Sequence, residues 1–343
     1  MPIAASAAIA AIAALVCAGL IVVIRPWLER YALAHPNARS SHTAPTAQGG
    51  GVAVVAAAIG ASCAASFFVP VVGQDATPLT LVTAIILMAA VGAMADLYPV
   101  NVGPRLLLQG LATALVIYTL PAELRAAPLL PWWFERILLV IGGLWFVNLV
   151  NFMDGLDWMT VAEAVPVTAA IAVIGYLEPL PPLALIASLA LCGAMIGFAY
   201  FNRPVAKLFL GDVGSLPIGL VLGWLLVLLA GSGGRAAAIL LPLYYVADST
   251  ITLLRRLRNG ERVWQAHRTH FYQRATVAGY SVTEVVARVF AVNLALGGLA
   301  IATVVFRGMT VEIAALIAGG ALVARLLIIF ARGPNASLRR PVS

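Results

Sequence analysis

Two asparagines and two aspartates lie within ten residues, from Asn148 to Asp157, directly after the apolar run 137–147. Asn148 and Asn151 are three residues apart, as are Asp154 and Asp157, so each pair shares one face if the segment is helical. Such polarity at the end of a hydrophobic run is costly and requires a reason. Carboxylate and amide oxygens suit a hard cation such as Mg²⁺. A plain polar turn between two helices is the alternative interpretation.

A second polar segment, residues 34–51, is rich in turn-forming and hydrogen-bonding residues and ends in Gly49, Gly50 and Gly51. Successive glycines allow backbone amide groups to approach a ligand closely, as they do in loops that bind phosphate. The three glycines are therefore candidate substrate-binding residues. A flexible linker is the alternative.

Two further aspartates lie beside apolar segments. Asp96 is a lone carboxylate at the end of one of them, where it either acts in the site or caps a helix. Asp212 lies between Gly211 and Gly214 ahead of another, and the glycines leave its carboxylate uncrowded for a metal ion. Ser215 follows at the start of that apolar segment, where a helix N-terminus favours a phosphate group. Capping of this helix by Ser215 is the alternative.

Basic and imidazole side chains are dense in residues 266–274, which contain His267, Arg268 and His270. This density suits an anionic ligand, and contact with lipid phosphates is the alternative. The two histidines could supply half of a zinc site, but no cysteine lies nearby to complete it. Carboxylates, glycine-rich turns and a basic segment together favour phosphoryl transfer, in which positioning and charge neutralisation supply most of the catalysis.

The elements that must position these residues are hydrophobic. The chain has 343 residues, of which 62% are hydrophobic and 10% are charged, and its mean hydropathy is +0.99. Soluble domains contain about 25% charged residues, so the sequence predicts an all-α, polytopic integral membrane protein. About eleven segments approach the length of roughly 20 apolar residues that a spanning helix requires. They are 3–24, 48–70, 78–95, 105–121, 134–150, 158–177, 181–201, 214–231, 235–254, 283–306 and 309–331.

Basic residues are concentrated on one side of this predicted bundle. One set of connections and the C-terminal tail contain Arg25, Arg30, Arg39, Arg105, Arg203, Lys207, Arg255, Arg256, Arg258, Arg262, Arg268, Arg274, Arg332, Arg339 and Arg340, and the opposite set contains Arg125, Arg136, Arg235 and Arg307. Because cytoplasmic loops are rich in Lys and Arg, the first set is predicted to be cytoplasmic. The N-terminus is then outside and the C-terminus inside.

The histidines and all the aspartates except Asp75 fall on the same predicted side, so the active site is expected on the cytoplasmic face. The net charge of +7 comes without the basic stripe or aromatic platform of a nucleic-acid-binding protein. An ion-coupled transporter is the competing class, and it requires ionisable residues and broken helices near the middle of the membrane. The predicted segments are nearly free of charge there. The sequence predicts a single transmembrane domain over 1–343 that includes a cytoplasmic loop, 255–283.

Several of these motifs resemble those of the polyprenyl-phosphate N-acetylhexosamine-1-phosphate transferases. Residues 148–157 resemble the family's Asn-x-x-Asn-x-x-Asp-Gly-x-Asp motif, and residues 209–215 resemble its Phe-Met-Gly-Asp-x-Gly-Ser motif. Residues 266–274 are similar to its Ala-His-Arg-x-His-x-Tyr-Gln-Arg motif. Residues 36–51 resemble a pattern typical of the branch that starts O-antigen and related surface glycans. The resemblance extends over essentially the whole chain, in the same order.

The resemblance implies that a UDP-N-acetylhexosamine donates its sugar-1-phosphate to undecaprenyl phosphate, forming undecaprenyl-diphospho-sugar and UMP at the bacterial inner membrane. It implies Mg²⁺, with Mn²⁺ as a substitute, and Asn151 and Asp212 as its ligands. The catalytic residues that it implies are Asp96, Asp154, Asp157, Asp212, His267 and His270. The substrate-binding residues that it implies are Asn37, Arg39, Ser40, Ser41, His42, Gly49, Gly50, Gly51, Arg105, Asn148, Phe209, Gly211, Ser215 and Arg268.

Within this set, the resemblance gives Asp96 the position near the lipid phosphate at which a base is proposed in the family. A phosphate monoester is already largely anionic at neutral pH, so a base need contribute little. Asp154 and Asp157 would shape the nucleotide-sugar site, and Phe209 would lie against the uracil. His267 and His270, with Arg268, would hold phosphate or the sugar's substituents.

The sequence departs from the family pattern at several positions. Ala95 replaces the first member of an adjacent Asp pair, and Ala34 stands where Asp is frequent. Ala47 and Gln48 replace Pro and Arg, and Trp158 replaces the usual Gly after Asp157. These changes bear on sugar specificity and on rate, but they leave the implied metal ligands in place.

The pattern in residues 36–51 favours 6-deoxy or GlcNAc-type donors of surface polysaccharides. UDP-GlcNAc, UDP-QuiNAc, UDP-FucNAc and UDP-GalNAc all remain open. A peptidoglycan precursor is the less favoured donor. A catalytically altered homologue, or a transporter of lipid or sugar phosphates, is the alternative to an enzyme. A homodimer is compatible with the sequence, which contains no signal for oligomeric state.

Overall fold

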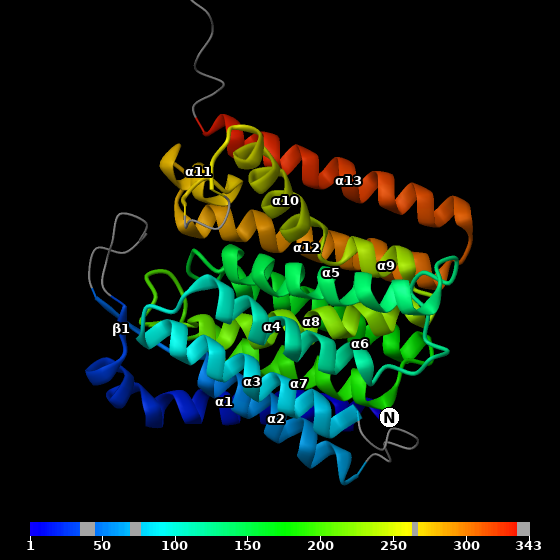
Figure 1. Ribbon diagram of the computed structural model, residues 1–343, viewed down its shortest axis with the longest axis horizontal. Helices are drawn as coiled ribbons and strands as arrows, with labels where there is room; N and C mark the ends of the chain where they lie inside the picture. Colours follow the sequence, from blue (N-terminus) through cyan, green and yellow to red (C-terminus); the bar gives the residue numbers. More distant parts are fainter. Residues whose placement is uncertain (35–44, 69–76, 263–266, 335–343) are drawn as a thin grey trace, which may run out of the picture.

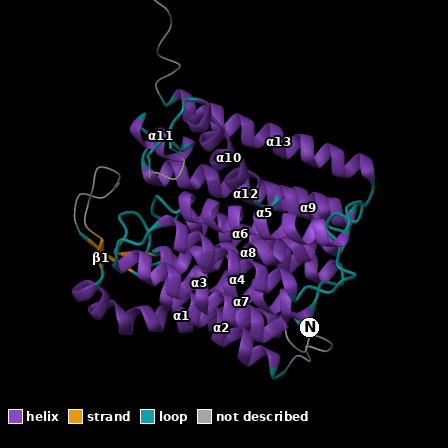
Figure 2. Ribbon diagram, viewed as in Figure 1, coloured by secondary structure: helices purple, strands orange, loops and turns teal. Residues whose placement is uncertain are grey.

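The computed structural model describes residues 1–34, 45–68, 77–262 and 267–334. Within these ranges, thirteen helices form a bundle, and three short strands lie at one end of it (Figures 1 and 2). The helices are α1 (Ile3–Tyr31), α2 (Gly51–Ser66), α3 (Thr77–Leu97), α4 (Val102–Tyr118), α5 (Trp132–Met153), α6 (Met159–Leu177), α7 (Pro182–Ala199), α8 (Asp212–Gly231), α9 (Arg235–Leu240), α10 (Leu243–Arg258), α11 (Phe271–Val277), α12 (Val282–Val305) and α13 (Met309–Arg332). The strands are β1 (Leu33–Ala34), β2 (Thr46–Gln48) and β3 (Leu208–Phe209).

Eight of these helices are long and apolar enough to cross a membrane. They are α1, α3, α5, α6, α7, α8, α12 and α13. Apolar segments fold in this way because a helix satisfies its own backbone hydrogen bonds where no water is available. The prediction of an all-α, polytopic membrane protein is confirmed. Of the three remaining predicted segments, two are the shorter apolar helices α2 and α4.

The third remaining segment, predicted as one span over 235–254, is broken in two. α9 ends at Leu240 and α10 begins at Leu243, with Pro242 between them. Proline has no N–H group and cannot continue the helical hydrogen-bond ladder. α10 then extends to Arg258, so the predicted loop 255–283 contains the end of α10 as well as the whole of α11.

Small residues allow the helices to approach closely. A Cβ atom added at Gly193 or Gly197 of α7 would overlap backbone atoms of Ala10 or Ala14 in α1. Small residues at helix contacts are typical of membrane proteins, in which van der Waals packing drives helix association. The first and seventh helices therefore lie directly against each other, although they are far apart in sequence.

The three strands form a small sheet that the all-α prediction did not include. β2 pairs with β1 in the antiparallel direction, with Ala47 opposite Leu33, and with β3 in the parallel direction, with Gln48 opposite Phe209. The sheet brings the segment that precedes α2 beside the segment that precedes α8. Figure 1 shows β1 and α11 at the same end of the bundle and the N-terminus at the opposite end. The polar motifs therefore meet at one end of the helices.

Candidate active site

Asp212, the first residue of α8, lies in a polar cluster built from three helices. Its Oδ1 accepts a hydrogen bond of 2.7 Å from Nδ2 of Asn151 on α5, and its Oδ2 lies 2.9 Å from Nη2 of Arg105 on α4. The same Arg105 nitrogen donates to Oδ1 of Asn151 at 3.1 Å, so the guanidinium bridges both side chains. The structure thus brings together the two predicted metal ligands, Asn151 and Asp212.

Asp96, near the end of α3, caps the N-terminus of α8. Its carboxylate accepts hydrogen bonds from the backbone amides of Asp212 at 2.9 Å and Val213 at 3.0 Å, and from the side-chain amide of Gln48. A negative charge at a helix N-terminus is favourable because the amide groups there carry partial positive charge. The capping interpretation of Asp96 therefore describes its contacts, although the capped helix is α8. Its role as a base remains a prediction.

Two glycines make this capping contact possible. A Cβ atom on Gly92 of α3 would overlap the backbone of Asp212, so the two helices touch at this point. Gly211 has a φ of +76°, which favours glycine, and a Cβ atom there would lie 2.6 Å from Oδ2 of Asp96. Gly211, predicted to bind substrate, therefore has a structural role in admitting the Asp96 carboxylate.

Ser215 does not cap α8, contrary to the alternative interpretation of the sequence. It lies inside the helix, is fully buried, and accepts a hydrogen bond of 2.8 Å from Asn151. The sequence also predicted a phosphate at the start of this helix. The amide groups of Asp212 and Val213 there donate to Asp96 instead. The structure assigns Ser215 to the positioning of Asn151.

The three glycines predicted to bind substrate are bound within the protein. The amides of Gly49 and Gly50 donate to the carbonyl of Phe209, and that of Gly51 donates to the carbonyl of Leu210 at 2.9 Å. A Cβ atom on Gly51 would overlap the backbone of α8 at Gly214. These glycines therefore allow α2 and α8 to pack closely, and their amides form hydrogen bonds within the protein.

Asp154 and Asp157 do not share a helical face, because α5 ends at Met153. Asp154 is partly buried, and its Oδ1 accepts a hydrogen bond of 2.5 Å from the hydroxyl of Thr160. Asp157 is buried and accepts the amide of Ala206 at 2.9 Å. Asp157 therefore fixes the segment that precedes β3, whereas Asp154 faces the cavity described below.

Trp158 occupies a backbone conformation that normally favours glycine, with a φ of +64°. Its amide donates to Oδ1 of Asn202 at 2.7 Å, and its indole Nε1 donates to the carbonyl of Ala199 at 2.6 Å. These bonds tie the turn after α5 to the end of α7. Of these two bonds, the one from the indole is made by the side chain that replaces the usual glycine.

His270 is buried and is held by Asp248, a fully buried residue of α10. Nδ1 of His270 lies 3.2 Å from Oδ1 of Asp248, which also accepts the amide of Phe271 at 2.9 Å. Oδ2 of Asp248 accepts the amide of Tyr272 at 3.1 Å. The imidazole ring of His267 lies beside that of His270, with 4.8 Å between the ring centroids. Asp248 therefore connects α10 to α11 and orients His270.

A cavity of about 840 Å³ opens between α4, α5, α10 and the histidine segment. Its polar lining consists of predicted site residues and one threonine, and its apolar lining comes from α4, α5 and α10. The polar residues are Arg105, Asn148, Asn151, Asp154, His267, His270 and Thr250, and the apolar ones include Leu106, Ile141, Leu144, Trp145, Leu253, Leu254 and Leu257. The structure thus brings six predicted residues to one cavity, whose remaining lining is mostly apolar side chains.

The remaining predicted residues lie elsewhere. Phe209 is in β3 and partly buried, and Arg268 is partly buried beside the histidines; neither lines the large cavity. Asn37, Arg39, Ser40, Ser41 and His42 lie outside the described residues. Within the described part of the chain, no three His, Cys, Asp or Glu side chains are placed to share a metal ion.

Gln109, a residue that the motif analysis missed, supports the polar lining of the cavity. It is fully buried on α4, and its Oε1 accepts a hydrogen bond of 2.8 Å from Nδ2 of Asn148. Asn148 also donates to the carbonyl of Leu144, one turn earlier in α5. Gln109 therefore fixes the amide orientation of the predicted substrate-binding residue Asn148. A lone glutamine in an apolar segment was the only signal for it in the sequence.

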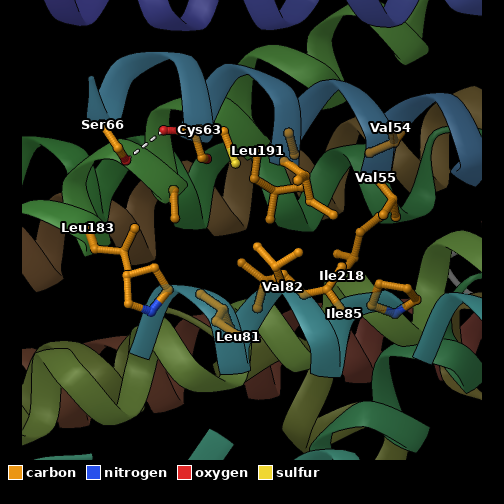
Figure 3. A pocket seen from close by; sticks show the side chains of 17 residues that line it. Val54, Val55, Cys63, Ser66, Leu81, Val82, Ile85, Leu183, Leu191 and Ile218 are labelled. Carbon is orange, nitrogen blue, oxygen red and sulfur yellow. Dashed lines mark hydrogen bonds between the residues drawn. The ribbon is translucent and has the colours of Figure 1, made fainter. Parts of the chain in front are cut away.

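A second cavity, shown in Figure 3, is small and apolar. It has a volume of about 80 Å³ and lies between α2, α3, α7 and α8, with Val54, Leu81, Val82 and Ile218 among its lining residues. The hydroxyl of Ser66 beside it donates to the carbonyl of Ser62 at 2.9 Å, within its own helix. No charged side chain lines this cavity among the described residues.

The pKa of Asp154 gives a testable pH dependence. Burial raises this pKa to about 7, and the neighbouring carboxylates of Asp212 and Asp96 act in the same direction. The folded protein then retains a proton that the unfolded chain releases near pH 4. Its free energy of unfolding is therefore expected to fall as the pH rises between about 4 and about 7. Thermal unfolding in EDTA across this range measures the slope. Asp154→Asn should flatten it, and an unchanged slope in the variant would contradict the assignment.

The capping role of Asp96 predicts a linked loss of stability and activity. In Asp96→Asn, an NH₂ group replaces one of the two carboxylate oxygens, so the backbone amide of Asp212 or of Val213 faces a donor and loses its acceptor. We expect a loss of about 1–3 kcal/mol in the free energy of unfolding, typical of hydrogen bonds to a charged group. Melting and turnover should be measured on the same samples. Gln48→Ala is the matched control, because it removes one donor and leaves both backbone bonds. A variant that melts like the wild type would show that capping contributes little.

Comparison with known proteins shows what these residues are similar to. Residues 78–230, which run from α3 to α8 and include Asp96, Asn151 and Asp212, match the model of glycosyl transferase family 4. The resemblance seen in the sequence motifs is confirmed at this level.

Two curated relatives are phospho-N-acetylmuramoyl-pentapeptide-transferases from Francisella. The protein of Francisella tularensis subsp. novicida is 29% identical over 180 residues, which cover 47% of this chain and 48% of the relative. That of Francisella philomiragia subsp. philomiragia is 30% identical over 169 residues, covering 43% and 45%. The chain thus spans about half the length of the curated relatives it matches.

Proposed function

We propose that this protein transfers N-acetylhexosamine-1-phosphate from a UDP-sugar to undecaprenyl phosphate, as the first membrane step in the synthesis of a cell-surface polysaccharide. The products are an undecaprenyl-diphospho-sugar and UMP. The proposal rests on the family of residues 78–230 and on the large cavity. The proposal includes a location in a bacterial inner membrane, with the active site on the cytoplasmic face, as the distribution of basic residues in the sequence predicts.

The observation that carries the proposal is the amphiphilic character of the cavity. One part of it is lined by Arg105, Asn151 and His270, and another part by leucines of α4, α5 and α10. A polyprenyl phosphate has this same division, with a dianionic head and a long hydrocarbon chain. A soluble substrate would not require the apolar wall, and a lipid without a charged head would not require the polar groups. The cavity therefore suits an acceptor that is a phosphorylated lipid.

The residues present fit a Mg²⁺ ion. A positive group, the Arg105 guanidinium, already lies between Oδ2 of Asp212 and Oδ1 of Asn151, at 2.9 and 3.1 Å. Mg²⁺ is commonly held by one or two carboxylates together with substrate phosphates and water. The carboxylate of Asp212 and the amide oxygen of Asn151 would hold it here. When bound, the ion would neutralise charge on the leaving group.

The reaction requires one bond to form and one to break. An oxygen of the lipid phosphate attacks the phosphorus that carries the sugar, and the bond from this phosphorus to the bridging oxygen of UMP breaks. UMP departs with that oxygen and its electron pair. The acceptor is largely dianionic at neutral pH, so the protein needs mainly to orient and neutralise. Arg105 and the His267–His270 pair supply cationic or hydrogen-bonding groups at the cavity for this purpose.

The donor is proposed to be a UDP-N-acetylhexosamine or its 6-deoxy derivative, from the sequence pattern before α2. The relatives' names refer to a phospho-N-acetylmuramoyl-pentapeptide, so this donor belongs in the same test. Membranes that contain the protein would receive undecaprenyl phosphate, Mg²⁺ and one labelled UDP-sugar at a time. We expect lipid-linked label with one donor, lipid-dependent release of UMP, and loss of both in EDTA.

Two results would contradict parts of this proposal. The absence of a lipid-linked product with every donor would exclude the enzyme and favour an altered homologue or a transporter. Product formation only with the N-acetylmuramoyl-pentapeptide donor would replace the proposed surface-glycan role with one in peptidoglycan synthesis. Replacement of Mg²⁺ by Mn²⁺ is expected to preserve activity, because both ions accept oxygen ligands.

A further inference from the structure

A separate apolar cavity of about 370 Å³ lies between α10, α11 and α13. Its lining includes Leu243, Ala247, Ile251, Phe271, Val323 and Leu327. None of the described side chains that line it is ionisable. Figure 1 shows these three helices together on one side of the bundle. α13 is long and apolar enough to span the membrane, so the cavity lies beside the bilayer, where a hydrocarbon chain is available to fill it.

Positive charges gather where this cavity meets α11. The guanidinium carbon of Arg255 lies 5.4 Å from the centroid of the Phe271 ring, and that of Arg274 lies 6.0 Å from it. Neither arginine forms an ion pair with a carboxylate in the described ranges, whereas the adjacent Arg256 pairs with Glu261 at 2.7 Å. Arg332, exposed in the last turn of α13, adds a third positive charge at the same end of the bundle.

We propose that this cavity binds an anionic phospholipid, with an acyl chain between α10 and α13 and the phosphate at Arg255 and Arg274. The apolar lining suits the chain, and two guanidinium groups at the rim suit the phosphate geometrically and electrostatically. Arg255 lies in the last turn of α10 and Arg274 in the last turn of α11. A basic residue near an anionic leaflet contributes about fivefold to lipid affinity.

The bound lipid would support the wall of the active site. α10 separates the two cavities, because Leu253 lines the larger one and Ile251 lines the smaller one. His270 and Phe271, adjacent in sequence, also face different cavities, and both are held by Asp248. A lipid that packs against Phe271 therefore stabilises the start of α11, where Asp248 orients His270. The effect on turnover rests on the proposed function, but lipid binding does not.

The test uses the full-length protein in a neutral detergent, with thermal unfolding as the readout. We expect phosphatidylglycerol to raise the melting temperature and phosphatidylcholine to have little effect. Arg255→Ala with Arg274→Ala should weaken the apparent affinity for phosphatidylglycerol about 25-fold, from two contributions of about fivefold. Arg258→Ala is the matched control, since it removes an exposed charge from the same helix turn without a contact to Phe271. Its effect should be well below that of the double variant.

Other outcomes would overturn the proposal. Equal stabilisation by phosphatidylcholine, or by inorganic phosphate alone, would exclude a site that needs both the anionic head group and the chain. An effect of Arg258→Ala as large as that of the double variant would indicate diffuse surface attraction. Ala324→Trp fills the cavity from an exposed position on α13 and should remove the effect of phosphatidylglycerol while both arginines remain. Retention of that effect in a folded Ala324→Trp protein would place the lipid elsewhere.

Discussion

Asp212→Ala is expected to abolish sugar-1-phosphate transfer while leaving a folded protein. The substitution removes the only carboxylate that contacts both Arg105 and Asn151 among the described residues, and with it the proposed Mg²⁺ ligand. Loss of a preorganised electrostatic contact of this kind typically costs about 100- to 1,000-fold in turnover, and loss of the metal adds to it. The side chain of Asp212 is 27% exposed, so its removal should cost at most about 1 kcal/mol of stability. Turnover and melting temperature together measure the two effects.

The controls separate the metal from the charge. Asp212→Asn keeps the size of the side chain and one acceptor oxygen but loses the negative charge, so it should also be nearly inactive. Glu123→Ala removes an exposed carboxylate that lies outside the cavity, and it should retain full activity. If Asp212→Ala turned over at the wild-type rate, the assignment of Asp212 as a metal ligand would be refuted.

Asp248→Ala is expected to cause the largest loss of stability. Asp248 is fully buried and accepts hydrogen bonds from the amides of Phe271 and Tyr272 and from the hydroxyl of Tyr244. It also contacts the imidazole of His270. Removing it leaves these donors without their acceptor in the protein interior, and such losses cost about 3–5 kcal/mol. Chemical unfolding in detergent would measure the change, and proteolysis between α10 and α11 should become faster.

Two milder substitutions calibrate this result. Thr252→Val removes the weakest donor to Asp248, at 3.3 Å, and should cost only about 1 kcal/mol. Asp248→Asn keeps one acceptor but turns an NH₂ group toward the backbone amides, so it should fall between the other two. If the free energy of unfolding of Asp248→Ala equalled that of the wild type, α11 would be held mainly by apolar packing against α13.

The membrane fold could be predicted from the sequence because its signal is long and continuous. A run such as 283–306 is apolar throughout, and the backbone has no alternative to a helix in hydrocarbon. The break at Pro242 was missed because the flanking residues are equally apolar on both sides, so hydropathy runs smoothly across it. The β1–β2–β3 sheet was missed for a different reason. Its strands have two or three residues each, which is too short for a recognisable pattern.

The candidate site was predictable in its residue types but not in all of its contacts. Asn151 and Asp212 come together as the motifs indicated, from α5 and α8. The capping of α8 by Asp96 links residues 116 positions apart, and no local pattern reports such a contact. Asp248 was predicted to lie on the same side as the other polar residues but was given no role, because a single aspartate in an apolar segment does not reveal its partners. Gly51 was predicted to bind a ligand, because the local sequence cannot distinguish a glycine that allows close helix packing from one that allows a ligand to approach the backbone.

The capping of α8 by Asp96 has a consequence for biogenesis. Membrane chains are synthesised from the N-terminus, so α3 is made before α8, with four helices between them. Until α8 follows, the carboxylate of Asp96 has no helix start to cap. A nascent chain that stops before residue 212 therefore contains the first seven helices but neither the capped α8 nor the Asn151–Asp212 pair. The α8 cap and the Asn151–Asp212 pair are therefore acquired together, when the eighth helix docks against the third.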